Sequence, residues 1–151
     1  MTIESFTTEA TRLILPLFDE ADALTLGQTL ATLARAENLP VVINIRTADR
    51  TLFHAALPGS SPLNDVWARR KSNVALMFQK SSMLVGLELK EKASSLAANG
   101  LPNADFADHG GAVPICVQGV GMVAVATVSG LPSREDHALV VRGIETLLTG
   151  L

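Results

Sequence analysis

Arg70 stands out among the charged residues because of its place in a predicted helix. The segment from residue 62 to about residue 79 has apolar residues at helical spacing, and Arg70 falls on the face that carries Leu63, Trp67, Val74 and Met77. An arginine that faces inward needs a partner. It could form a structural ion pair, lay its stem along the edge of the core, or bind the carboxylate or phosphate of a ligand with its guanidinium fork.

Two further segments could present backbone N–H groups to an anion. The glycines of His109-Gly110-Gly111 make a flexible backbone beside an imidazole, although a turn that begins the next strand would have the same sequence. Ser129-Gly130 connects a predicted strand to the N-terminus of the last helix, where free N–H groups and the helix dipole favour negative charge. In that helix, Ser133 and Asp136 could instead act as caps.

The candidate ligand-binding residues are therefore Arg70, His109, Gly110, Gly111, Ser129, Gly130, Arg134 and His137. Arg134 and His137 are included because they lie in the first turn of the last helix. No residue is identified as catalytic, because the sequence has no nucleophile elbow, P-loop or dinucleotide-binding fingerprint.

The remaining histidine and the single cysteine favour structural roles. His54 shares a strand face with Leu52 and Ala56, which predicts a hydrogen-bonded histidine in the core or at an interface. Cys116 lies in a predicted strand and is expected to be a small core residue. The three histidines are far apart in the sequence and have no zinc-type spacing, so we expect no metal site.

Turn and capping residues divide the chain into helices and strands. One helix is expected between Asp19 and Asn38, and another begins at Pro62 with Ser61 as its N-cap. Two more are expected at about 82–97 and from Ser133 onward, and the irregular stretch 100–111 precedes a strand whose Pro114 indicates an edge or a bulge. The predicted strands form two hairpins, 41–46 with 51–57 and 112–117 with 122–128.

Two hairpins with helices before, between and after them predict an α+β fold in which helices cover an antiparallel sheet. At 151 residues, the chain is expected to form one domain over residues 1–151. Apolar residues make up 48% of it and charged residues only 18%, which leaves much apolar surface for a monomer. We therefore expect a homo-oligomer.

Net charge and local hydropathy exclude several classes of partner. The formal charge of −3 argues against nucleic acid binding, which needs a clustered basic face. The longest apolar run, at 122–126, is too short to cross a bilayer, and residues 1–6 lack the pattern of a signal peptide. A single cysteine agrees with a reducing compartment. We expect a cytoplasmic protein that does not insert into membranes.

Four blocks of sequence carry a resemblance that extends over nearly the whole chain. They are Leu52-Phe53-His54-Ala55-Ala56-Leu57-Pro58-Gly59, Trp67-Ala68-Arg69-Arg70-Lys71, His109-Gly110-Gly111-Ala112-Val113-Pro114-Ile115, and Val128-Ser129-Gly130-Leu131-Pro132 with Arg134-Glu135-Asp136-His137. In this order they resemble the GlcG and HbpS-like group, also called haem-degrading domains. The match is most specific to its branch, uncharacterised protein family 0303.

The resemblance implies a profilin-like fold, in which a central antiparallel sheet lies between helical layers, and a ring-like or higher homo-oligomer. Members of the wider group bind haem or corrinoid-related ligands, and a eukaryotic relative is associated with the targeting of tail-anchored proteins. The chain itself has few aromatic residues and no tyrosine, which makes a poor porphyrin pocket.

Three functional hypotheses remain from the sequence. The first is an oligomeric protein that binds a small anionic ligand through the candidate residues, without a named reaction. The second is haem binding with haem degradation, in which a histidine is the axial ligand. The third is an interaction scaffold or adaptor linked to protein targeting, in which the blocks maintain the oligomer.

Overall fold

A computed structural model describes residues 1–150 of the chain, so Leu151, the last residue of the expected domain, lies outside the described residues. The elements in chain order are α1 (Ile3–Arg12), β1 (Ile14–Leu15), α2 (Glu20–Ala36), β2 (Val42–Arg46), β3 (Thr51–Ala56), α3 (Pro62–Phe78), α4 (Ser82–Glu91), the 3₁₀ turn η1 (Ala97–Asn99), β4 (Ala112–Val117), β5 (Gly121–Ser129) and α5 (Ser133–Thr149). Both predicted hairpins and all four predicted helices are present. The sequence did not predict α1 and β1.

The strands form one five-stranded sheet in the order β1-β4-β5-β2-β3. Neighbouring strands from β4 to β3 are antiparallel, as expected, whereas β1 pairs with β4 in parallel and makes the sheet mixed. The fold is α+β and profilin-like. The edge or bulge predicted from Pro114 is confirmed. Strand β1 pairs with β4 only at Cys116 and Val117, and a register shift between β4 and β5 lies between Ile115 and Cys116.

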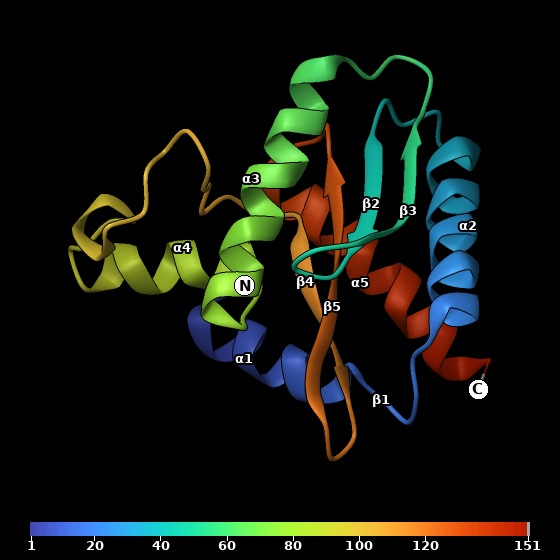
Figure 1. The fold of residues 1–151 in the computed structure, drawn as a ribbon, viewed down its shortest axis with the longest axis horizontal. Coiled ribbons are helices and arrows are strands. Elements are labelled where there is room, and N and C mark those ends of the chain that lie inside the picture. The colour runs from blue at the N-terminus through green and yellow to red at the C-terminus, as the bar shows by residue number, and fades with distance from the viewer. Residues whose placement is uncertain (151) are drawn as a thin grey trace.

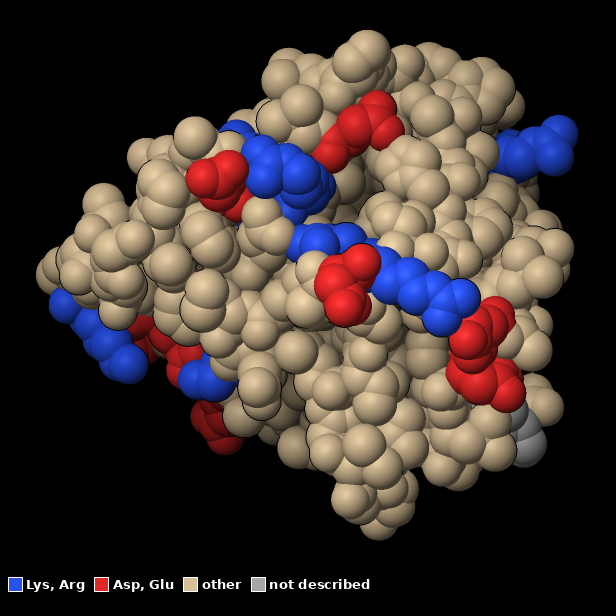
Figure 2. Space-filling model, in the orientation of Figure 1, with Lys and Arg blue, Asp and Glu red and all other residues tan. Residues whose placement is uncertain are grey.

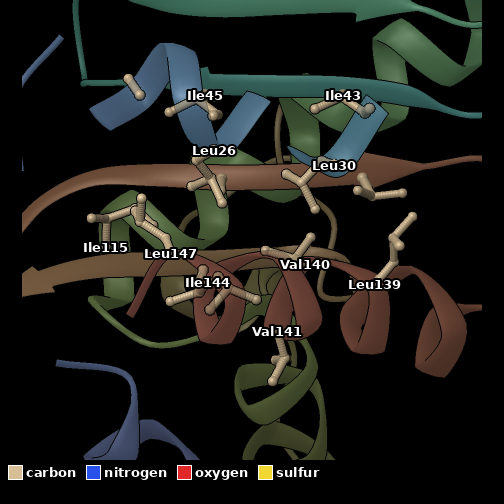
Figure 3. Close-up of a cluster of buried hydrophobic side chains, with 14 of the residues drawn as sticks. Leu26, Leu30, Ile43, Ile45, Ile115, Leu139, Val140, Val141, Ile144 and Leu147 are labelled. Carbon is tan, nitrogen blue, oxygen red and sulfur yellow. The ribbon is translucent and has the colours of Figure 1, made fainter. Parts of the chain in front are cut away.

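One face of the sheet is covered by α2 and α5, which lie beside and behind it in Figure 1. Strand residues that point to this side, such as Ile43 and Ile45, meet leucines of α2 and the apolar face of α5, as Figure 3 shows. Asp19 begins α2 with a capping box, in which its carboxylate accepts a hydrogen bond from the Asp22 N–H at 3.0 Å. This is the main hydrophobic core.

The other face is covered by α3, which lies next to β4 and β5 (Figure 1). Here the predicted apolar stripe is wrong at both ends, because Leu63 is 63% exposed and Met77 is 56% exposed. The buried face of α3 consists instead of Ala68, Lys71, Ser72, Val74 and Ala75. Small side chains let this helix lie close to the sheet, so its orientation follows them and turns Leu63 and Met77 to the outside.

Helix α4 is shorter than predicted and ends at Glu91, since Ala93 takes a left-handed backbone conformation (φ 51°). A long, mostly irregular connection then leads to β4 at Ala112, in agreement with the expected loop at 100–111. None of the helices in residues 1–150 has the length and apolar character needed to span a bilayer.

Candidate functional site

A pocket of about 350 Å³ lies where β5 ends and α5 begins, beside the first half of α3. Strand β5 delivers Ser129 to the sheet face that α3 covers, because its neighbour Val128 points into the main core. The walls come from α3, from the loop before β4 and from the connection between β5 and α5. The lining residues are Asn64, Trp67, Lys71, His109, Ser129, Gly130, Leu131, Pro132, Ser133 and Asp136.

A buried ion pair forms the floor of this pocket. The Lys71 ammonium donates hydrogen bonds to Asp136 Oδ2 at 2.7 Å, to the Gly110 carbonyl at 2.9 Å and to the Val128 carbonyl at 3.3 Å. Burial lowers the pKa of Lys71 and raises the pKa of Asp136, and the attraction between the two charges opposes both shifts. All three N–H bonds of the ammonium have acceptors, so we assign the charged pair to the folded state near neutral pH.

The other oxygen of Asp136 shapes the connection before the helix. Asp136 Oδ1 accepts a hydrogen bond from the Leu131 N–H at 2.9 Å, which holds the turn between β5 and α5. The N-cap of α5 is Pro132, and no side chain caps this helix. The interpretation of Ser133 and Asp136 as caps is therefore wrong, because Ser133 is already the first helical residue and Asp136 binds the preceding loop.

Without a side-chain cap, hydrogen-bond donors remain free at the start of α5. The Glu135 and Asp136 N–H groups bond to the Pro132 carbonyl at 2.9 and 3.0 Å. In residues 1–150, the N–H groups of Ser133 and Arg134 have no acceptor. No hydrogen bond of the Ser129 side chain is found in residues 1–150. Ser129 is only 1% exposed and lines the pocket, whereas the fully buried side-chain atoms without a partner lie elsewhere, on Asn44, Thr127 and His137. Ser129 and Ser133, which both line the pocket, therefore carry donors without an acceptor in residues 1–150.

Trp67 forms an aromatic wall of the pocket. Its ring packs edge to face against the imidazole of His109, with 5.2 Å between the ring centroids. The guanidinium of Arg70 lies 4.4 Å from the centre of the same indole, and Arg70 Nε donates to the Asn103 carbonyl at 2.7 Å. Arg70 thus supports Trp67 and does not line the pocket. The buried cation of α3 is the next residue, Lys71.

Gly110 and Gly111 lie behind the ion pair and are buried. Gly111 has a φ of +139°, and a methyl group there would come within 2.7 Å of the Lys71 ammonium. A methyl group on Gly110 would lie 2.5 Å from the Ser133 carbonyl. The glycines therefore allow the loop before β4 to approach α3 and α5 closely, and Gly110 contributes a carbonyl oxygen to Lys71.

Arg134 and His137 point away from the pocket toward α1. His137 Nε2 lies 2.6 Å from Glu9 Oε1, and the imidazole packs edge to face against Phe6. Arg134 donates to the Met1 carbonyl at 3.3 Å. The Arg134 guanidinium also lies 5.8 Å from the centre of the Phe6 ring. Helix α1 and the residue Met1 before it therefore account for both side chains.

The structure brings together three of the predicted residues, His109, Ser129 and Gly130, in the lining of one pocket. Their role in ligand binding stays a prediction. Sequence reasoning missed Lys71, whose signal was present: Ala68, Ser72 and Ala75 place small residues around it at the spacing of a helix face that packs closely.

The other candidates have structural partners. His54 lies between Asn44 and Asp65, with its ring nitrogens 3.1 and 2.8 Å from them, so the predicted hydrogen bonding is confirmed. Its side chain is 40% exposed, so it is not a core residue. Cys116 is only half-buried, so the expectation of a core residue is wrong, and burial raises the pKa of its thiol. Residues 1–150 contain no cluster of three or more His, Cys, Asp or Glu side chains arranged to hold a metal ion.

The sequence profile described as "Haem degrading protein HbpS-like" matches residues 18–145. The chain belongs to the HbpS-like family. Within it, the chain is 49% identical over 140 residues to a UPF0303 protein of Acidobacterium capsulatum, which covers 92% of this chain and 84% of the relative. A UPF0303 protein of Burkholderia thailandensis is 45% identical over 143 residues, or 94% of this chain and 87% of the relative.

Solved structures share this HbpS-like fold. The Ybr137w protein superposes with a TM-score of 0.90 at 28% identity, over 99% of this chain and 89% of that one. HbpS superposes with a TM-score of 0.70 at 18% identity, over 87% and 89% of the two chains. A PduOC–haem complex gives 0.70 at 17% identity, over 85% and 93%. At such identities, the last two establish the fold alone.

Proposed function

We propose that this HbpS-like protein binds a small organic anion in the pocket between α3 and α5. The observation that carries the proposal is that two groups meet in one pocket: the uncapped N-terminus of α5, and the side chain of Ser129, which is 1% exposed and has no hydrogen bond within residues 1–150. Helix N-termini favour anions, and a free hydroxyl beside one offers a further hydrogen-bond donor. A volume of about 350 Å³ lies within the range of ligand pockets, at its small end.

Trp67 gives a direct test because it is the only tryptophan in the chain and lines the pocket. Titration of the intact protein with a panel of small carboxylates and phosphates should change Trp67 fluorescence saturably for at least one of them. Ser129→Ala should weaken that response. If no anion in the panel changes the fluorescence or raises the melting temperature, the proposal fails and the scaffold hypothesis gains support.

Haem is the rival ligand, because the family is named for haem degradation and one similar structure is a haem complex. The pocket fits it poorly. Its volume of about 350 Å³ is small for a porphyrin, and the imidazole of the only histidine in its lining, His109, packs against Trp67. We expect no stoichiometric Soret band on haem titration. A tight complex that His109→Ala abolishes would reverse this ranking.

We also propose that the protein works as a homo-oligomer through the outer face of α3. Leu63 and Val66 are 63% and 44% exposed on this helix, and Met77 lies further along it. Figure 2 shows wide areas of the surface without charged side chains, which agrees with the 18% share of charged residues. A second copy of the chain presents the same apolar face and would cover it.

Light scattering tests the assembly at micromolar concentration. The wild type should have a mass well above 15.9 kDa, and Leu63→Glu with Val66→Glu should lower that mass while the circular dichroism spectrum is kept. A matched double substitution at exposed residues of another helix, Leu24→Glu with Ala21→Glu on α2, should leave the mass unchanged. A wild-type protein that is monomeric in this assay would contradict the proposal.

A further inference from the structure

The proposed function leaves open whether the anion is a phosphate or a carboxylate, and the charges in the pocket bear on this choice. The lining contains one lysine and one aspartate, Lys71 and Asp136, which neutralise each other at 2.7 Å. The three N–H bonds of the lysine are already used by protein acceptors. Arg70 lies on the Trp67 ring outside the lining. No lysine or arginine of the lining is therefore left for a ligand in the part of the chain that the structure describes.

Phosphate groups and carboxylates differ in what they need from such a site. A phosphate monoester carries a charge of about −1.5 to −2 near pH 7 and is usually met by arginine or lysine. A carboxylate carries one charge, which the partial charge of about +0.5 at a helix N-terminus suits better. The charge of this pocket therefore favours a monoanion.

The number of donors in the lining also suits a carboxylate. Ser133 offers its N–H, Ser129 its hydroxyl and Asn64 an amide Nδ2, since Asn64 Oδ1 is occupied by the Ser61 N–H at 2.9 Å. Two carboxylate oxygens accept about four hydrogen bonds. Ser129 is 1% exposed and without a partner in residues 1–150, so it is a second sign of a ligand, independent of the helix end.

The rest of the pocket suits an apolar group. Trp67, Leu131 and Pro132 line it with carbon atoms. We infer that the pocket takes a monocarboxylate attached to a ring or another compact apolar body, in preference to a phosphate ester. This inference rests on the proposed function and adds the chemical class of the ligand.

Calorimetric titrations of the full-length protein with four probes separate the contributions of the ring, the type of acid and the charge to the binding free energy. Benzoate carries both a ring and a carboxylate, phenyl phosphate exchanges the acid, benzyl alcohol removes the charge, and acetate removes the ring. Benzoate should bind at least about tenfold more tightly than each of the other three, because only it satisfies the donors, the charge and the apolar wall together.

Two variants locate the carboxylate. Ser129→Ala should weaken benzoate binding about fivefold, as expected for one lost hydrogen bond, whereas Ser94→Ala, at an exposed serine outside the pocket, should not change it. Ser133→Pro removes the N–H at a first helical position that tolerates proline and should weaken benzoate further than Ser133→Ala does. Circular dichroism verifies that each variant is folded.

The outcomes distinguish the inference from the proposed function. Phenyl phosphate binding more tightly than benzoate would overturn the carboxylate assignment and leave the anion site standing. Equal binding of benzyl alcohol and benzoate would show that the acid is not recognised and would overturn both. Failure of all four probes, or benzoate binding that Ser129→Ala and Ser133→Pro leave unchanged, would also count against both.

Discussion

Adjacent residues of α5 form two buried pairs with different consequences. Asp136 points toward α3 and pairs with Lys71, and His137 points toward α1 and pairs with Glu9. In the first pair, every N–H bond of the ammonium has an acceptor, and both residues line the proposed ligand pocket. In the second pair, the Nδ1 atom of His137 is buried without a partner in residues 1–150.

The Lys71–Asp136 pair organises the ligand pocket, whereas the Glu9–His137 pair attaches the N-terminal helix α1 to α5. Lys71 ties together the loop before β4, the end of β5 and the first turn of α5, so its loss would disturb the pocket and the fold together. Glu9 joins only α1 to α5. Stability and ligand binding should therefore depend on the two pairs to different extents.

Removal of one charge from the first pair should have the largest effect. Lys71→Met leaves the Asp136 carboxylate buried without its cation, and the free energy of unfolding should fall by about 3–5 kcal/mol. Urea denaturation followed by circular dichroism measures this loss. The double variant Lys71→Met with Asp136→Leu should recover much of it, since no charge is then left in the interior. A single variant that loses less than about 1 kcal/mol would show that the pair does not hold the site together.

The second pair should matter less and should not affect the pocket. Glu9→Ala leaves His137 without its acceptor, so the free energy of unfolding should fall by about 1–3 kcal/mol. Hydrogen exchange should increase in α1, whereas the response of Trp67 to ligand should stay as in the wild type. Equal loss of ligand binding in Glu9→Ala and in Ser129→Ala would contradict the separation of the two regions.

A substitution of Arg70 tests whether its guanidinium holds the Trp67 ring in place. Arg70→Ala removes the cation over the Trp67 ring and the hydrogen bond to Asn103, and a loss of about 0.5–1 kcal/mol in stability is expected. The emission maximum of Trp67 should shift, because one face of the indole becomes hydrated. A complete loss of anion binding, equal to that expected for a residue in direct contact with the ligand, would show that Arg70 reaches the pocket after all.

Removal of the exposed carboxylate of Asp19 should have the smallest effect on stability, and it provides a reference for the substitutions of buried charges. The Asp22 N–H donates to Asp19 and lowers the pKa of this carboxyl below its ordinary value of 3.8. The carboxylate therefore stabilises α2 above pH 3.8, and its contribution is lost as the pH falls through the lower pKa of the folded state. Asp19→Ala should lower the melting temperature by about 2 °C at pH 7. A difference from the wild type that persists unchanged well below pH 3.8 would contradict this cause.

Helices and strands that begin or end at local signals could be predicted from the sequence. The orientation of a side chain could not be predicted where contacts between distant parts of the chain determine it. Asp19 and Ser61 begin helices as capping patterns predict, and Pro114 lies beside a bulge on a partly covered strand. The orientation of α3, in contrast, depends on how closely small side chains let it approach β4 and β5. The apolar stripe of α3 therefore predicts that Arg70 faces inward, whereas the buried cation of this helix is the next residue, Lys71. The sequence also places His137 in the ligand site, but in the structure it turns toward α1. Its partner Glu9 lies 128 positions earlier in the chain, so no local pattern reveals the contact.

A crystal structure of the protein with bound benzoate would test the central claim most directly. We expect density for one carboxylate between the Ser133 N–H and the Ser129 hydroxyl, with the ring against Trp67 and the Lys71–Asp136 pair unchanged beneath it. An empty pocket at saturating benzoate, or density only at another place on the surface, would contradict the assignment of this pocket as a binding site.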